Sequence, residues 1–272
     1  MKRILLATNL GPSSCHALER ALLVAKSHTA SLHVLHVAPL ENEEAPDTLA
    51  RQVEAAIERL QRNLEDEFGA GFAPESAKSL TGDPVLAIAA EAKSVEADLL
   101  IAGLSESADA RASIDGTILK QLLIECDAPI VVVKSQPSRG YEKVLVGLDL
   151  SPTSHRALET ALQVAPTAHF AIVHASERQG DDDLRAKINR IVRGCVSITR
   201  TAMGLHQGAI DIYLETGDVA DVIARHANQL APDLVVFGRH NRGAANGPYL
   251  GSGARGIIEA LDADMLVTVS TE

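Results

Sequence analysis

The chain of 272 residues contains the same sequence pattern twice. RILLATNLGPSSCHALERALLVA (3–25) aligns with KVLVGLDLSPTSHRALETALQVA (143–165) at an offset of 140 residues. Two later blocks also keep register, 32–38 with 170–176 and 81–103 with 216–238, so length changes fall only between the blocks. Self-similarity over so long a period predicts two copies of one domain. We place the boundary in the polar stretch SQPSRGY (135–141), which gives domains 1–138 and 139–272.

Each copy alternates short apolar runs with helix-like segments. The runs lie between turn residues and are apolar throughout, as in strands that are covered on both faces. The expected strands are 4–8, 32–37, 75–80, 98–102 and 130–133 in the first copy, and 144–148, 170–175, 210–214, 233–237 and 265–269 in the second. Two helices are expected to begin near Pro12 and Pro152. Further helices are expected at 49–67, 84–95, 117–125, 183–203, 219–230 and 252–261. This alternation predicts an α/β fold with two repeated, doubly wound parallel-sheet domains.

Composition excludes several classes of function. The formal net charge of −11 argues against nucleic-acid binding and against anionic membrane surfaces. With 3% aromatic residues and no Trp, the chain lacks the stacking platforms that single-stranded nucleic acid requires. The three cysteines form no pair motif, and no apolar run reaches the length of a signal peptide or a membrane span. We therefore expect a cytoplasmic protein in a reducing compartment.

In doubly wound sheets, ligands bind at the carboxyl ends of the strands, where the strand order changes direction. The loops after the first and fourth strands are therefore the candidate sites. After the fourth strand the second copy reads GRHNRGAANGPYLGSG (238–253). Glycines let backbone N–H groups approach a phosphate, Ser252 suits a helix start, and Arg242 supplies charge. This pattern fits a phosphate-binding loop, and it also fits a solvated loop whose glycines only turn the chain.

The same loop in the first copy reads GLSESADARASIDGT (103–117), without the internal glycines. Glu106, Asp109 and Asp115 bring negative charge to the place where a phosphate would bind. If one copy binds a polyphosphate, we expect the second copy to do so.

The loops after the first strands differ in the same direction. Asp149 follows the first strand of the second copy, and Asn9 takes its place in the first copy. An Asp at this position suits a ribose hydroxyl, an adenine-edge donor or a metal ion that accompanies phosphates. The more common use of such a residue is an Asx turn at the entrance to a helix.

Other patterns are set aside. Gly251–Gly256 matches G-x-G-x-x-G, but it does not directly follow a strand, as a dinucleotide fingerprint must. There is no P-loop motif, no serine-nucleophile elbow and no metal-ligand spacing among the 10 histidines. His36 and His174 occupy equivalent strand ends, where we expect partly buried, hydrogen-bonded rings and not metal ligands, and we expect His226 on the surface of a helix.

Over nearly its whole length, twice, the chain resembles the universal stress protein (UspA-like) family. Nucleotide-binding members of that family carry G-x2-G-x9-G-[ST] after the fourth strand and an Asp after the first. The second copy matches with Gly238, Asn241, Gly251 and Ser252, where Asn replaces the second Gly; the first copy gives Gly103, Glu106, Gly116 and Thr117. The segments around Asp149 and Asn9 and both TGD turns are also similar to the family.

The resemblance implies a Rossmann-like fold of the HUP type and one adenine-nucleotide site. It implies that Asp149 contacts the nucleoside or its Mg or Mn ion, and that the base is surrounded by Gly147, Phe237 and Ala175. Near the ribose and phosphates it implies Gly238, Asn241 and Arg242, and around the phosphates Gly251, Ser252 and Gly253. Asn9, Gly103, Glu106, Gly116 and Thr117 would form a degenerate site. The family's dimerisation through the last strand implies that 130–133 and 265–269 pair within this chain as an internal pseudo-dimer, with a homodimer also possible.

Three functions follow for comparison. The first is a cytoplasmic stress-response regulator that binds ATP in its second domain, with at most weak ATPase activity because no residue is placed as a general base. The second is a scaffold of the same fold that binds an unknown protein partner and no nucleotide. The third is an adenylyl-transferring enzyme, but the chain lacks the H-x-G-H-type motif that such enzymes need.

Overall fold

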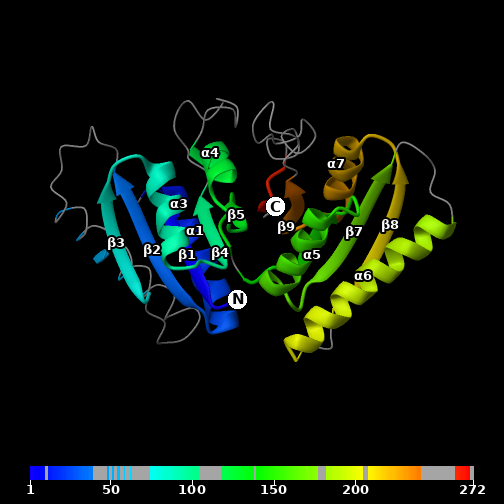
Figure 1. Ribbon diagram of the computed structural model, residues 1–272, viewed down its shortest axis with the longest axis horizontal. Helices are drawn as coiled ribbons and strands as arrows, with labels where there is room; N and C mark the ends of the chain where they lie inside the picture. Colours follow the sequence, from blue (N-terminus) through cyan, green and yellow to red (C-terminus); the bar gives the residue numbers. More distant parts are fainter. Residues whose placement is uncertain are drawn as a thin grey trace. The chain divides into compact units, whose positions relative to one another are not determined.

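In the computed structural model the chain divides into two units, Met1–Gly140 and Tyr141–Glu272 (Figure 1). The structure describes residues 1–9, 12–38, 74–103, 118–137, 139–176, 182–204, 208–239 and 261–269, with a few single helical positions between 48 and 62. Each unit is an α/β domain of the kind that the alternating sequence pattern predicts, so the expected fold class is confirmed.

The first unit holds five parallel strands in the order β3-β2-β1-β4-β5. Its elements are β1 Arg3–Thr8, α1 Pro12–His28, β2 Ser31–Ala38, β3 Ser76–Thr81, α3 Pro84–Ser94, β4 Leu99–Gly103, α4 Ile118–Glu125 and β5 Ile130–Val133. Helix α1 packs on β1, β2, β4 and β5, whereas α3 packs on β2 and contacts α4. Because helices cover the strands, consecutive residues such as Ile4, Leu5 and Leu6 are all fully buried.

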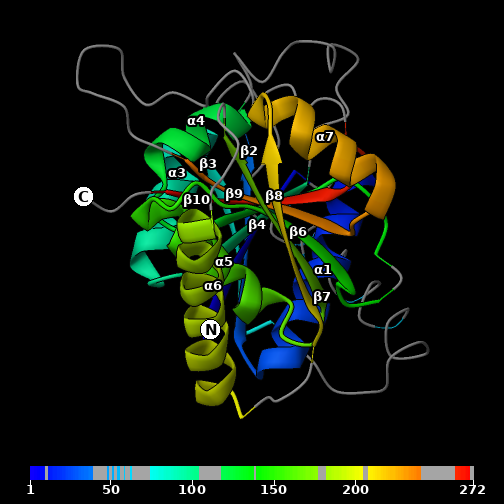
Figure 2. The same ribbon diagram turned by 90° about the vertical axis from the view of Figure 1, so that its right-hand side faces the viewer.

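The second unit repeats this topology in the order β10-β9-β6-β7-β8. Its elements are β6 Lys143–Gly147, α5 Pro152–Val164, β7 His169–Ser176, α6 Asp182–Ala202, β8 Ile210–Thr216, α7 Val219–Leu230, β9 Leu234–Arg239 and β10 Asp264–Val269. Helix α5 packs on α6, β9 and β10, and α7 packs on β6 and β7. Figure 2 shows α6 and α7 on opposite sides of β8, the arrangement of a doubly wound sheet.

The predicted elements that fall on described residues agree with this structure within a few residues at each end. Both Gly-Asp turns start helices as expected: the Asp83 carboxylate accepts from Leu86 N at 3.0 Å, and the Asp218 carboxylate accepts from Ala220 N at 2.8 Å. The expected helix at 252–261 lies almost wholly outside the described residues, and the expected helix at 49–67 is described only at single helical positions.

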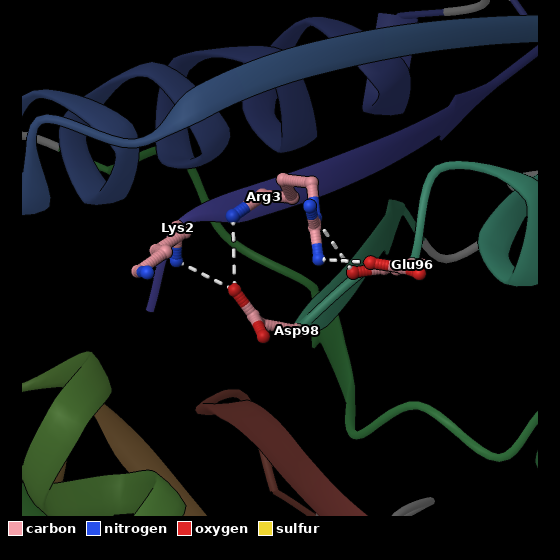
Figure 3. A network of polar contacts seen from close by, with 4 residues as sticks. All are labelled: Lys2, Arg3, Glu96 and Asp98. Carbon is pink, nitrogen blue, oxygen red and sulfur yellow. Dashed lines mark hydrogen bonds and ion pairs between the residues drawn. The ribbon is translucent and has the colours of Figure 1, made fainter.

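An aspartate at the start of the fourth strand ties that strand to the start of the first strand in both units. Asp98 Oδ2 accepts from Lys2 N at 2.6 Å and Arg3 N at 3.0 Å, and the Arg3 guanidinium pairs with Glu96 at 2.5 Å (Figure 3). Asp233 Oδ2 likewise accepts from the amides of Glu142 and Lys143, each at 2.8 Å. The carboxylates thus satisfy two adjacent amides at the ends of strands β1 and β6.

We expect Asp98→Ala and Asp233→Ala each to lower the free energy of unfolding by about 1–2 kcal/mol, because two hydrogen bonds of modest net value are lost. Asp→Asn at the same positions keeps an acceptor oxygen and should cost less. Urea unfolding of the full chain measures both pairs. Equal stability of the Ala and Asn variants would contradict the role of the acceptor.

In each unit, a side chain of the third strand contacts a side chain of the following helix, and the residue types at these equivalent positions differ between the two units. In the first, Lys78 of β3 pairs with Glu91 of α3 at 2.7 Å. In the second, the equivalent positions hold Tyr213 and His226, whose ring centroids lie 4.7 Å apart, and His226 Nε2 lies 3.3 Å from Glu215 Oε1.

The expectation that His226 lies on the helix surface is wrong, because the residue is only 5% exposed. It follows Val222 and Ile223 on the face of α7 that packs on the sheet.

All three cysteines are free thiols. Burial, and then the charge of Glu159, raises the pKa of Cys195 to about 11 against a small opposing effect of the Thr199 hydrogen bond. Burial also raises the pKa of Cys126.

In a Cys15→Ser variant we therefore expect slow alkylation of the two remaining thiols at pH 8. A thiolate with a pKa of about 11 instead of 9 is about 100-fold less abundant at that pH, because each pKa unit changes the fraction tenfold. The rate at Cys195 should keep rising to pH 10, whereas the urea-unfolded control levels off earlier. Iodoacetamide labelling followed by mass spectrometry measures both rates, and a plateau below pH 9 in the folded protein would contradict the shift.

Candidate functional site

The corner between β6 and α5 carries the aspartate that the sequence singles out. Asp149 is exposed just beyond the end of β6, and its Oδ1 accepts from Ser151 N at 3.0 Å. Ser151 caps α5 by accepting from Ser154 N at 3.1 Å. The Asx turn anticipated at this position is therefore formed. It holds the Asp149 carboxylate at the entrance to α5.

The backbone of this corner is fixed from the neighbouring strand. Leu148 N donates to Val173 O at 2.9 Å, and His174 Nδ1 lies 2.7 Å from Leu148 O. The expected hydrogen bond of His174 is thus present, and the residue, 9% exposed, is more deeply buried than the partial burial expected. Leu150, two residues after Leu148, has a left-handed backbone with φ 65°, which is uncommon for a residue with a side chain of this size.

The end of β9 meets the first turn of α5. A Cβ placed on Gly238 would lie 2.7 Å from Thr153 C and 2.8 Å from Ser154 N, closer than real Cβ atoms approach backbone. Only glycine therefore allows β9 to run this close to the helix. On the other face, a Cβ on Gly147 would lie 3.5 Å from Ile223 Cδ1, an ordinary contact with α7. Phe237, 9% exposed, follows the β6–β9 register onto that same face.

These residues lie where the strand order changes direction. From β6 the chain runs outward through β7 to β8, whereas β9 and β10 lie on the other side of β6. Asp149, Gly147, Phe237 and Gly238 thus come together at the carboxyl ends of two adjacent parallel strands. Ala175 lies near the carboxyl end of β7, opposite Glu215 of β8. Asn241, Arg242, Gly251, Ser252 and Gly253 lie outside the described residues.

The equivalent corner of the first unit differs in its side chains. Asn9 is exposed after β1, and Gly103 ends β4. Ala7 and Ala102 stand in the places of Gly147 and Phe237, and both are buried. The remaining residues of the predicted degenerate site, Glu106, Gly116 and Thr117, lie outside the described residues, as do Asp109 and Asp115.

Sequence reasoning placed Asp149 and Gly238 at the site but missed what holds them. It did not anticipate that His174 bonds the backbone of the Asp149 corner, or that Gly238 is required by helix α5. A signal for the first existed in the repeat: Ser79 lies opposite His36 in the first unit, whereas Leu214 lies opposite His174 in the second. The side chain of Leu214 cannot form a hydrogen bond, so the His174 ring requires a different partner, which is the Leu148 carbonyl oxygen.

Across the described residues, no group of three or more His, Cys, Asp or Glu side chains is placed to hold a metal ion. None of the described helices combines the length and the hydropathy that a bilayer span requires.

Comparison with known proteins gives the family. The model of the universal stress protein family matches residues 1–134 and again residues 140–269. The chain belongs to the universal stress protein family. It contains two domains of that family in tandem, as the repeat and the resemblance indicated. No curated protein matches the sequence significantly.

Several solved structures are similar to this chain, and the first two below have the same fold. A universal stress protein from Archaeoglobus fulgidus DSM 4304 matches with a TM-score of 0.74 and 19% identity, covering 98% of this chain and 98% of that chain. A protein of unknown function from Pseudomonas aeruginosa PAO1 matches with a TM-score of 0.63 and 21% identity, covering 99% of this chain and 92% of that chain. The universal stress protein from Archaeoglobus fulgidus in complex with dAMP matches 48% of this chain and 97% of its own, with a TM-score of 0.35 and 13% identity.

Proposed function

We propose that the second universal stress protein domain binds one adenine nucleotide, ATP with Mg or Mn, and that the first domain binds none. One observation carries the proposal: the Asp149 carboxylate, the first turn of α5 and the glycine end of β9 meet at the switch point of the sheet. This is the place where doubly wound sheets bind nucleotides.

The chemistry of this corner suits a nucleotide. An exposed carboxylate accepts hydrogen bonds from a ribose or an adenine amino group and attracts a metal ion that accompanies phosphates. The N-terminus of α5 adds positive potential nearby. Gly238 lets the end of β9 run directly against the first turn of α5, so the backbone of the strand end lies beside the helix N-terminus.

The sequence beyond β9 favours the second domain over the first. Asn241, Arg242, Gly251, Ser252 and Gly253 supply glycines, donors and positive charge where the resemblance places ribose and phosphates. The first domain instead has Asn9 for Asp149, and Glu106, Asp109 and Asp115 in its loop. Repulsion between these carboxylates and a triphosphate opposes binding there.

Isothermal titration of the full chain with Mg-ATP tests the proposal. We expect about one ATP per chain, and a loss of affinity of at least tenfold in Asp149→Ala, because a charge-assisted contact is removed. Gly251→Glu should abolish binding. Asn9→Ala is the matched control in the first domain and should bind like the wild type. Absence of binding, or loss of binding only with Asn9→Ala, would overturn the proposal.

The alternative scaffold function has one observation in its favour. The Asp149 carboxylate already serves the backbone through Ser151 N, so its presence is explained without a ligand. Under this alternative, Mg-ATP, AMP and cAMP all fail to bind, while the full chain captures one specific protein whose binding is lost on mutating the exposed loops.

The remaining parts of the proposal rest on the family resemblance. They are a regulatory role in a cytoplasmic stress response with weak ATP hydrolysis at most, pairing of the two domains through their last strands, a possible homodimer and an unknown protein partner. Light scattering of the purified chain, with and without Mg-ATP, measures the oligomeric state.

A further inference from the structure

We propose that His174 is a positioning residue for the nucleotide site, because it holds the Leu148–Ser151 corner that presents Asp149. The inference rests on the proposed function, since it assigns to Asp149 a contact with the nucleotide. His174 itself lies on β7, is 9% exposed and acts through the backbone of the neighbouring strand.

The contact defines the protonation of the ring. His174 Nδ1 lies 2.7 Å from the carbonyl oxygen of Leu148, and a carbonyl oxygen only accepts hydrogen bonds. Nδ1 must therefore carry the proton and donate it. In the neutral ring this leaves Nε2 unprotonated, so the structure assigns the Nδ1–H tautomer to His174.

The bond acts at a corner that needs external support. Leu148 immediately precedes Asp149, and Leu150 just beyond it has φ 65°, a conformation that costs free energy for a non-glycine residue. Leu148 N is also bonded, to Val173 O, so both polar groups of the Leu148 backbone are held by β7. The direction in which Asp149 leaves the sheet is set by these two bonds and by the Asx turn with Ser151.

In the first domain the equivalent histidine has a different partner on the third strand. There, His36 Nδ1 lies 3.1 Å from Ser79 Oγ, on the strand next to it. The residue opposite His174 is Leu214, which has no polar group, and the His174 ring bonds the Leu148 carbonyl. The exchange of Ser for Leu on the third strand accompanies the exchange of Asn9 for Asp149.

Four variants of the full chain test this role. His174→Leu removes the donor, His174→Asn keeps one because its Nδ2 takes the place of Nδ1, and Leu214→Ser offers His174 the hydroxyl partner that His36 has. His36→Leu is the matched control in the first domain. Each is titrated with Mg-ATP, its thermal unfolding is recorded, and hydrogen exchange of the segment 148–151 is followed.

We expect His174→Leu to weaken ATP binding about tenfold, the lower end of the cost of removing an outer partner of a ligand-binding side chain. Leu214→Ser should weaken it in the same direction, His174→Asn should restore it, and His36→Leu should leave it unchanged. Exchange at 148–151 should quicken in His174→Leu without global unfolding. Wild-type affinity and exchange in both His174→Leu and Leu214→Ser would overturn the proposal.

A spectroscopic measurement separates this inference from the proposed function. Nitrogen-15 correlation spectra of the histidine rings report which nitrogen of His174 is protonated, with or without nucleotide. The Nε2–H tautomer in the wild type would overturn the inference even if ATP binds. A wild type that shows the Nδ1–H tautomer but binds no ATP would overturn the proposed function, and with it the claim that the corner serves a nucleotide.

Discussion

Gly238→Ala is expected to lower the free energy of unfolding of the second domain by about 3 kcal/mol, the upper range for adding a methyl group to a packed interior. The new Cβ would lie 2.7–2.9 Å from three atoms of Thr153 and Ser154, two of them backbone atoms that cannot rotate away. The end of β9 must move away from α5, so ATP binding should weaken as well. Urea unfolding and calorimetric titration measure the two effects.

Gly147→Ala is the matched control. Its Cβ would lie 3.5 Å from Ile223 Cδ1 and 3.7 Å from Val236 O, which are ordinary contacts, and the first domain already carries Ala7 at the equivalent position. We expect its stability to stay close to that of the wild type. Equal losses of stability in the two alanine variants would contradict the special packing of Gly238 on the helix.

Gly208→Ala is expected to cost a similar amount, about 3 kcal/mol, for two combined reasons. Gly208 has φ 126°, a region that side chains disfavour, and a Cβ there would overlap the guanidinium of Arg200. Arg200 is 8% exposed and donates from Nη1 to Gly208 O at 2.7 Å. Thermal unfolding of the full chain measures the loss.

A double-mutant cycle separates the two reasons. Among the residues that the structure describes, the buried Arg200 Nε and Nη2 have no acceptor, and burial lowers the pKa of the guanidinium, so Arg200→Met removes unsatisfied donors along with one hydrogen bond. We expect it to change stability by less than about 1.5 kcal/mol, the net value of one such bond. In the Arg200→Met background, Gly208→Ala should cost clearly less. An unchanged cost would leave backbone strain as the whole reason.

The fold could be predicted from the sequence because local and repeated signals agreed. Buried strands such as 130–133 are apolar at every position, and the helix start Ser151-Pro152 of the second copy corresponds to Gly11-Pro12 in the first. Register between the two copies gave the α/β alternation independent support. The aspartates Asp98 and Asp233 were visible as leaders of apolar runs, but their partners lie about 90 residues away in sequence and only the fold brings them together.

The site could be predicted only in part, because its supports are contacts between strands. Asp149 lies just beyond the carboxyl end of β6 and Gly238 near that of β9, and the doubly wound topology marks these strand ends in advance. The bond from His174 to Leu148 depends on which residue of β8 lies opposite the ring. The sequence around His174 alone does not reveal that residue. His226 was misread for a different reason: a polar residue on a helix was assigned to solvent, although its spacing from Val222 places it on the buried face.

The Asp98 and Asp233 contacts also order events during synthesis. Each carboxylate joins the first strand of its domain to a residue made 90 to 96 positions later. A nascent chain that has produced β1, β2 and β3 therefore still lacks the partner strand on the other side of β1, and the amides of Lys2 and Arg3 have no carboxylate to bind. The central strand of each domain is therefore made first among its strands, and its second neighbour in the sheet is made only after the third strand.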